Sequence, residues 1–165
     1  MSNASYYSLL NNGKLTGDVI GAVEATAPVS ATGATLTCTM DTHAGRTIVI
    51  SAVAGCAVTL PAATGTGSVY RFIIGATITS NSTTIKVANT TDVMSGRAFV
   101  ISDGAAAVLG YATGATSDTI TLNGTTLGGL IGDHIEIIDA IAGTFAVRVF
   151  TAATGTEATP FSATV

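Results

Sequence analysis

Short runs in which apolar and polar residues alternate recur along most of this chain. Residues 47–51 place Ile48 and Ile50 on one parity, and the longest run, Val69–Thr79, repeats the pattern. Successive side chains of a strand point to opposite faces, so such runs favour half-buried strands. Sustained 3.6-residue periodicity is absent from every window of helical length. The pattern predicts an all-β protein.

Turn residues separate the runs. Asp103-Gly104 and Asn123-Gly124 are the strongest hairpin signals, because these residue types tolerate the backbone of tight turns. Gly75, inside the longest run, predicts a bulge or a bend. About eight to ten short strands at such spacing predict an antiparallel β-sandwich or barrel.

The strand parities also predict which side chains face the interior. Cys38 and Cys56 fall on apolar parities and are interpreted as two small buried hydrophobes. A disulfide would require their strands to be neighbours in register. Further inward positions are expected at Leu36, Met40, Val58, Leu60, Tyr70, Phe72, Ile74, Ala76, Ile78, Ile85, Val87, Ile120, Leu122, Ile131, Ile135, Ile137, Phe145, Val147 and Val149.

Strand signals are weak in residues 1–34 and strong afterwards. We therefore divide the chain into an N-terminal arm, residues 1–34, and a β-sandwich or barrel body, residues 35–165. The arm carries a small apolar cluster formed by Tyr6, Tyr7, Leu9 and Leu10. We expect this cluster to contact a neighbouring subunit or partner, with terminal disorder as the alternative interpretation.

Composition constrains the surroundings of the chain. It has 165 residues, of which 10% are charged, with a net charge of −4 and a mean hydropathy of +0.57. A chain this long suits one domain. No window of about 18 residues is apolar enough for a membrane helix, and no secretory signal precedes the body, so no membrane partner is expected. A surface so poor in charge predicts a homo-oligomer or a larger assembly.

Few side chains point to chemistry. The six lysines and arginines are dispersed, so no nucleic-acid partner is expected. His43, close to Asp41, is interpreted as a surface turn residue rather than a base. His134 and Glu136 share one side of a strand and would supply two metal ligands, but a third ligand is not identifiable.

Aspartates beside turns are interpreted as caps of local backbone donors. Asp133 belongs to this group, with Asp92, Asp103, Asp118 and Asp139. Neither a phosphate-binding loop nor a Gly-x-Ser-x-Gly elbow is present. We therefore predict no catalytic, cofactor-binding or metal-binding residues, no cofactor and no enzymatic activity. The alternative of a hydrolase would need paired carboxylates that converge in a groove.

Residues 41–165 resemble a known family in their turn-and-strand motifs. The segments are "VTLPAATGTGSVYRFIIG", "IKVANTTDVMSG", "TITLNGTTLGGLIGDHIEI" and "VRVFTAATGTEATPFSATV". They are similar to the head decoration (cement) and virion structural proteins of tailed bacteriophages. The resemblance implies a protein made in the bacterial host cytoplasm that binds the major capsid protein shell on the virion surface and stabilises it. It also implies a homo-oligomer, with a trimer favoured.

A second hypothesis assigns the same strands to a different virion part. A trimeric fibre or spike module would use exposed loops, such as residues 102–107 or 123–129, to bind a host-surface receptor or glycan. Stoichiometry separates the two hypotheses, because a decoration protein is needed in far more copies per particle than a fibre.

Overall fold

A computed structural model describes residues 10–11, 14–15, 27–104 and 107–165 of the chain. These residues form fourteen strands and one short helix, α3 (Met40–His43). The first two strands, β1 (Leu10–Asn11) and β2 (Lys14–Leu15), pair with each other antiparallel. The prediction of an all-β protein is confirmed.

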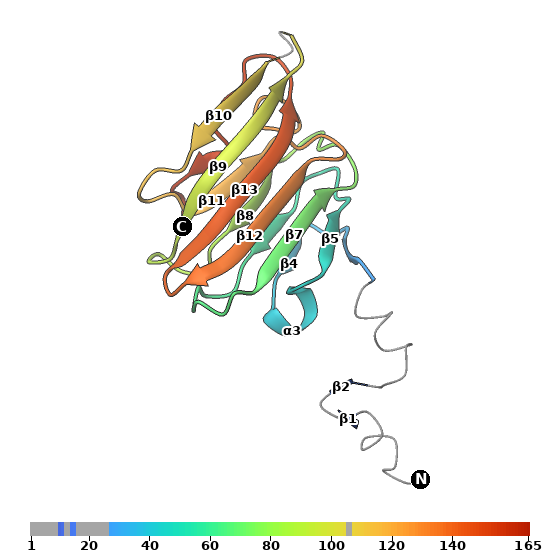
Figure 1. The fold of residues 1–165 in the computed structure, drawn as a ribbon. Coiled ribbons are helices and arrows are strands. Elements are labelled where there is room, and N and C mark those ends of the chain that lie inside the picture. The colour runs from blue at the N-terminus through green and yellow to red at the C-terminus, as the bar shows by residue number, and fades with distance from the viewer. Residues whose placement is uncertain (1–9, 12–13, 16–26, 105–106) are drawn as a thin grey trace.

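The remaining strands form two sheets, which lie one behind the other in Figure 1. The seven-stranded sheet has the order β10 (Val108–Ala112), β9 (Val93–Ser102), β13 (Thr144–Ala153), β12 (His134–Ile141), β7 (Val69–Ile74), β5 (Thr47–Ile50) and β3 (Val29–Ala31). The five-stranded sheet has the order β14 (Phe161–Ser162), β11 (Thr119–Leu122), β8 (Thr83–Lys86), β6 (Ala57–Thr59) and β4 (Thr35–Thr37). Each sheet keeps two edges, so a closed barrel is not formed.

Both sheets are mixed, and the prediction of an antiparallel body is wrong. From β3 to β8 the chain crosses to the other sheet after every strand. Each strand therefore pairs with the strand two before it in the chain, and the two strands run in the same direction. As a result β3, β5 and β7 are parallel neighbours in one sheet, and β4, β6 and β8 are parallel neighbours in the other. Strands β9 and β13 form a further parallel pair.

One hydrophobic cluster draws on the inward residues of both sheets. Registered neighbours form a buried row across the seven-stranded sheet: Ile48, Phe72, Ile135, Val149 and Ala98. A second buried row crosses the five-stranded sheet: Val58, Ile85, Ile120 and Phe161. Removal of such rows from water is the main stabilising term of a fold like this. The inward parities predicted for these strands are confirmed.

Two turn predictions have opposite outcomes. Asp103-Gly104 does lie in the connection between the antiparallel strands β9 and β10. Asn123-Gly124 does not form a hairpin, because β11 before it and β12 after it belong to different sheets. Gly124 has φ +76°, and an added Cβ would lie 1.8 Å from the carbonyl oxygen of Ile78. Glycine is needed there for a loop packed against another segment, not for a two-residue turn.

Four further expectations meet the structure at strand ends. β7 ends at Ile74 and the chain bends at Gly75, as predicted. Ile131 is wrong as an inward residue, because β12 begins only at His134 and Ile131 is 68% exposed in the preceding loop. Met40 is wrong as well, because the chain leaves β4 for the helix α3, where Met40 is exposed. Strand β3, which the sequence division assigns to the arm, pairs with β5 in the seven-stranded sheet.

The predicted contact cluster of the arm falls mostly outside the described residues. Tyr6, Tyr7 and Leu9 are not among them, and Leu10 is described only as part of β1. The contact predicted for this cluster stays a prediction.

Candidate interaction surface

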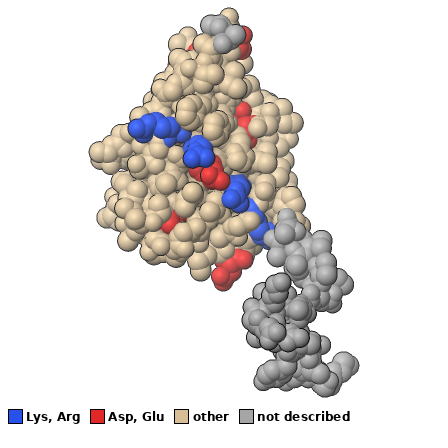
Figure 2. Space-filling view, in the orientation of Figure 1, with Lys and Arg blue, Asp and Glu red and all other residues tan. Residues whose placement is uncertain are grey.

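The outer face of the seven-stranded sheet carries a row of charged side chains. Residues one position away from the buried row point outward, because side chains alternate along a strand. Strand register therefore aligns Arg71 with Glu136, Glu136 with Arg148, and Arg148 with Arg97. Figure 2 shows the resulting band of cations with an acid among them, and the other acidic residues visible on this face lie apart from the band.

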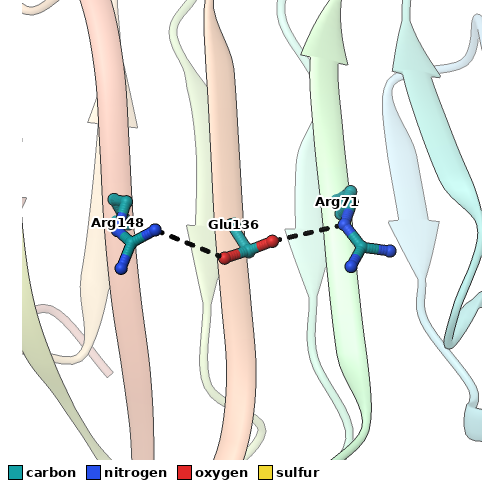
Figure 3. Close-up of polar contacts among 3 residues, drawn as sticks. All are labelled: Arg71, Glu136 and Arg148. Atoms are coloured by element: carbon teal, nitrogen blue, oxygen red, sulfur yellow. Dashed lines mark hydrogen bonds and ion pairs between the residues drawn. The ribbon is translucent and has the colours of Figure 1, made fainter.

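Glu136 lies between two arginines from neighbouring strands (Figure 3). Its Oε2 lies 3.2 Å from Nε of Arg71, and its Oε1 lies 4.0 Å from Nη1 of Arg148. The Arg148 side chain is 63% exposed, and ion pairs this exposed contribute about 0–1 kcal/mol. Arg97 donates to the carbonyl oxygen of Gly96 at 2.9 Å. With three arginines to one glutamate, the row is positive although the chain is acidic.

A second row, displaced by two residues along the strands, carries two phenylalanines. His134 is registered with Phe150, Phe150 with Phe99, and Phe99 with Gly110. The rings of Phe99 and Phe150 stack, with centroids 5.3 Å apart and planes inclined by 14°. Both rings remain substantially exposed, although aromatic side chains are normally among the largest contributors to buried apolar area.

A groove extends this row at the end of the sheet. Its volume is about 510 Å³. Five exposed apolar residues line it, and together they are called the apolar groove: Phe99, Ile101, Val108, Ile131 and Phe150. Strands β9, β10 and β13 supply four of them, and the loop before β12 supplies Ile131. Contiguous exposed apolar surface of this kind is typical of interaction sites.

Asp133 fixes the loop that carries Ile131. Its buried carboxylate accepts hydrogen bonds from the backbone N–H of Gly129 at 2.7 Å, Leu130 at 3.0 Å and Ala152 at 2.9 Å, and from the hydroxyl of Thr151. The predicted role of Asp133 as a turn cap is confirmed. Because two of these donors lie on β13, the carboxylate also holds the loop against the sheet, so the groove has a fixed wall.

Three other aspartates differ from the prediction of local caps. Asp92, Asp118 and Asp139 are buried, and each accepts from the backbone of a distant segment. Asp139 accepts from N–H of Gly65 at 2.7 Å and Thr66 at 3.0 Å. Asp118 accepts from N–H of Thr164 at 2.8 Å, and Asp92 from N–H of Ala63 at 2.8 Å. Asp103 is exposed in its turn.

The pKa values of two of these carboxyls are lowered. For Asp139, burial raises the pKa, and the hydrogen bonds from Thr66 and Gly65 outweigh burial and hold it below the ordinary value. For Asp118, burial is again opposed, here by hydrogen bonds from Thr164, Thr119 and Val165, with a lowered pKa as the result. Such carboxylates connect distant segments of the chain through charge-assisted hydrogen bonds.

The two histidines have different surroundings. His43 is buried at the end of α3, and its Nδ1 accepts from the backbone N–H of Thr39 at 3.0 Å. The prediction of a surface turn residue is wrong, because the ring folds back onto the residue that caps the helix. His134 and Glu136 do share the outer side of β12. Among the described residues no three potential ligands cluster around a metal-sized site.

Cys38 and Cys56 are free and buried, as predicted. Cys38 directly follows β4 and Cys56 directly precedes β6. These two strands are parallel neighbours with Leu36 aligned with Val58, so the two cysteines lie at opposite ends of the pair and are not in register. Burial, and then the nearby Cys56, raise the pKa of the Cys38 thiol to about 12. Thiols with so little thiolate are poor nucleophiles.

Comparison with family models, with curated proteins and with solved structures found no match to this chain. The described part of the chain contains no helix long and apolar enough to cross a membrane. The interaction surface itself was missed by the sequence reasoning. The signal was available, because Phe99 and Ile101 share the outward parity of Arg97, and Phe150 shares that of Arg148.

Proposed function

We propose that this protein is a structural virion protein of a tailed bacteriophage. It binds the outer surface of the capsid shell, stabilises it and catalyses no reaction. The observation that carries the proposal is the outer face of the seven-stranded sheet, where the apolar groove lies beside the arginine row. The sequence resemblance supplies the partner. We class the body as a β-sandwich, an architecture that presents such a face on a rigid plate.

The two parts of this face have different tasks. Burial of the apolar groove contributes a favourable transfer term of about 25 cal/mol per Å² of apolar surface removed from water, against which the entropy cost of association is set. The arginines favour an acidic area of shell and accelerate encounter with it. A protein that binds only the expanded shell stabilises that state in proportion to its differential affinity. Contacts that are weak in one copy gain strength when an oligomer makes several at once.

Attachment to heads tests the proposal. Wild-type protein and a Phe99→Ser, Phe150→Ser double variant are mixed with empty expanded heads of the phage that encodes the chain. The bound fraction is then measured by sedimentation. Val53→Ser is the matched control, because Val53 is exposed to a similar extent but lies outside the groove. We expect the double variant to lose at least about tenfold in affinity and the control to bind like wild type.

Two results would overturn this proposal. One is wild-type protein that ignores heads, and adhesion to host cells in that case would favour the fibre or spike module. The other is a double variant that keeps its fold and binds heads as well as wild type, which would place the contact elsewhere.

A further inference from the structure

Strand β10 is the last strand at one edge of the seven-stranded sheet (Figure 1). Within the described residues its only strand partner is β9. Natural edge strands usually carry lysine, proline or a bulge that prevents further pairing. The sequence of β10 is Val-Leu-Gly-Tyr-Ala, without a charge or a proline, and its register with β9 is unbroken.

Hydrogen bonds at the two ends of β10 show which backbone groups face the free edge. Ser102 N–H donates to the carbonyl oxygen of Ala107 at 2.9 Å, and Thr113 N–H donates to that of Gly96 at 3.2 Å. In an antiparallel pair, residues alternate between bonding inward to the partner strand and pointing away from it. The odd-numbered residues of β10 therefore bond to β9. The N–H and C=O groups of Val108, Gly110 and Ala112 point outward.

This arrangement is complementary to itself. When two copies of β10 lie antiparallel with Gly110 facing Gly110, Val108 of one copy faces Ala112 of the other. Every outward residue then meets an outward residue, which forms about six new hydrogen bonds in three pairs. The same patch serves both copies, as a two-fold symmetric interface requires.

Gly110 fits this arrangement better than it fits a lone chain. A Cβ at Gly110 would meet no atom within 4 Å, and its φ is not in the left-handed region. Neither space nor backbone conformation therefore requires glycine at this position in a single chain, where glycine weakens the interior of a strand. Glycine inside a strand often marks a place where another backbone approaches closely. Phe99 is the registered neighbour of Gly110 on β9. When the two glycines pair, the surface between the two Phe99 rings has no side chain on it. The two rings can then cover the paired glycines.

Charge also favours the two-fold arrangement. Arg97 is registered with Ala112 at one end of β10, and Ile101 with Val108 at the other end. Because the two β10 strands run in opposite directions, the arginine row of one copy lies beside the apolar groove of the other. Like charges are not brought opposite each other, which would be unfavourable across strands.

We propose that a second copy of this chain pairs with β10 and joins the two seven-stranded sheets into one continuous sheet. The pairing is antiparallel and centred on Gly110. This inference goes beyond capsid binding, and it makes the building block a dimer instead of the trimer that the sequence resemblance implies.

Sedimentation of the full chain tests the dimer. We expect wild type at twice the chain mass of 16.3 kDa, and Gly110→Lys at the chain mass under the same conditions, because two lysines would face each other. Gly104→Lys is the matched control, since Gly104 is exposed and a Cβ there also meets nothing within 4 Å. It should remain dimeric. A wild-type monomer or trimer, or a dimeric Gly110→Lys chain, would overturn the proposal.

Two further measurements separate the alternatives. Val108→Pro removes an N–H that points away from β9, so we expect the fold to survive and the dimer to be lost. Removal of residues 1–26 should leave the dimer intact, whereas its loss would assign the contact to the arm. Head binding is measured independently, so a failed dimer and a failed capsid interaction give different results.

Discussion

Buried aspartates connect segments that are far apart in this sequence. Asp139, at the end of the buried part of β12, holds residues of the loop between β6 and β7. Asp92 accepts a hydrogen bond from the backbone N–H of Ala63 in the same loop. The position of the loop between β6 and β7 therefore depends on these two buried carboxyl groups.

Replacing Asp139 by asparagine should destabilise the fold by about 2–3 kcal/mol at neutral pH, because buried donors lose a charged acceptor. The pKa of Asp139 is below its ordinary value of 3.8. Its carboxylate therefore stabilises the fold above that pH, and this contribution is lost as the pH falls through the folded-state pKa. Urea unfolding from pH 6 to pH 3 should show a shallower acid loss in the variant. Asp103→Asn, in an exposed turn, is the control, and parallel pH curves for Asp139→Asn and wild type would contradict the assignment.

The two cysteines should be inert in the folded protein. With the pKa of Cys38 raised to about 12 and that of Cys56 also raised by burial, almost no thiolate exists at pH 8. An aromatic disulfide reagent should label neither thiol on the time scale of minutes, and should label both once the chain is unfolded in guanidinium chloride. Rapid native labelling of either thiol would show that its strand opens or is exposed.

Single strands of this fold could be predicted from sequence, but their partners could not. Alternation identified the inward side chains of β5, β7 and β11, because burial on one face imposes period two on the residues themselves. The direction of a strand and the sheet to which it belongs produce no comparable pattern in the strand's own sequence. The Asn123-Gly124 pair is typical of a hairpin, yet here it serves a crossing between sheets, since the flanking strands are buried in different layers.

The long parallel pair of β9 and β13 depends on one close approach. An added Cβ at Gly96 would lie 1.8 Å from the carbonyl oxygen of Val147, the backbone directly across the ladder. Gly96→Ala should therefore push the two strands apart and cost about 1–3 kcal/mol. Thermal or urea unfolding measures the loss, with Gly104→Ala as a control in open space. Equal stability of the two variants would mean that the strands are not so closely paired.

In the whole molecule, the two faces of the seven-stranded sheet have different roles. The inner face is mostly apolar and contributes to the core, with Asp139 and Thr151 among its few buried polar residues. On the outer face, charged and apolar side chains lie in separate rows. Sequence reasoning treated the cations as dispersed, since Arg71, Arg97 and Arg148 are far apart along the chain. Only strand order and register bring them together, and neither property is encoded locally.

Charge on the outer face should govern the rate of attachment more than its final strength. An Arg97→Glu, Arg148→Glu variant should bind expanded heads more slowly than wild type at low salt. The difference should shrink as salt rises, because exposed charges are screened beyond about 8 Å at physiological ionic strength. Lys86→Glu, on the other sheet, is the charge control. Association rates that do not depend on salt would remove the arginine row from the binding mechanism.

Hydroxyl-radical footprinting of the protein, free and bound to phage particles, tests whether the outer face of the seven-stranded sheet binds the shell. We expect oxidation of Phe99 and Phe150 to fall on the particle, while oxidation of Met40, which is exposed on α3, does not change. Protection of Met40 with continued oxidation of both phenylalanines would contradict the claim that the outer face of the seven-stranded sheet binds the shell.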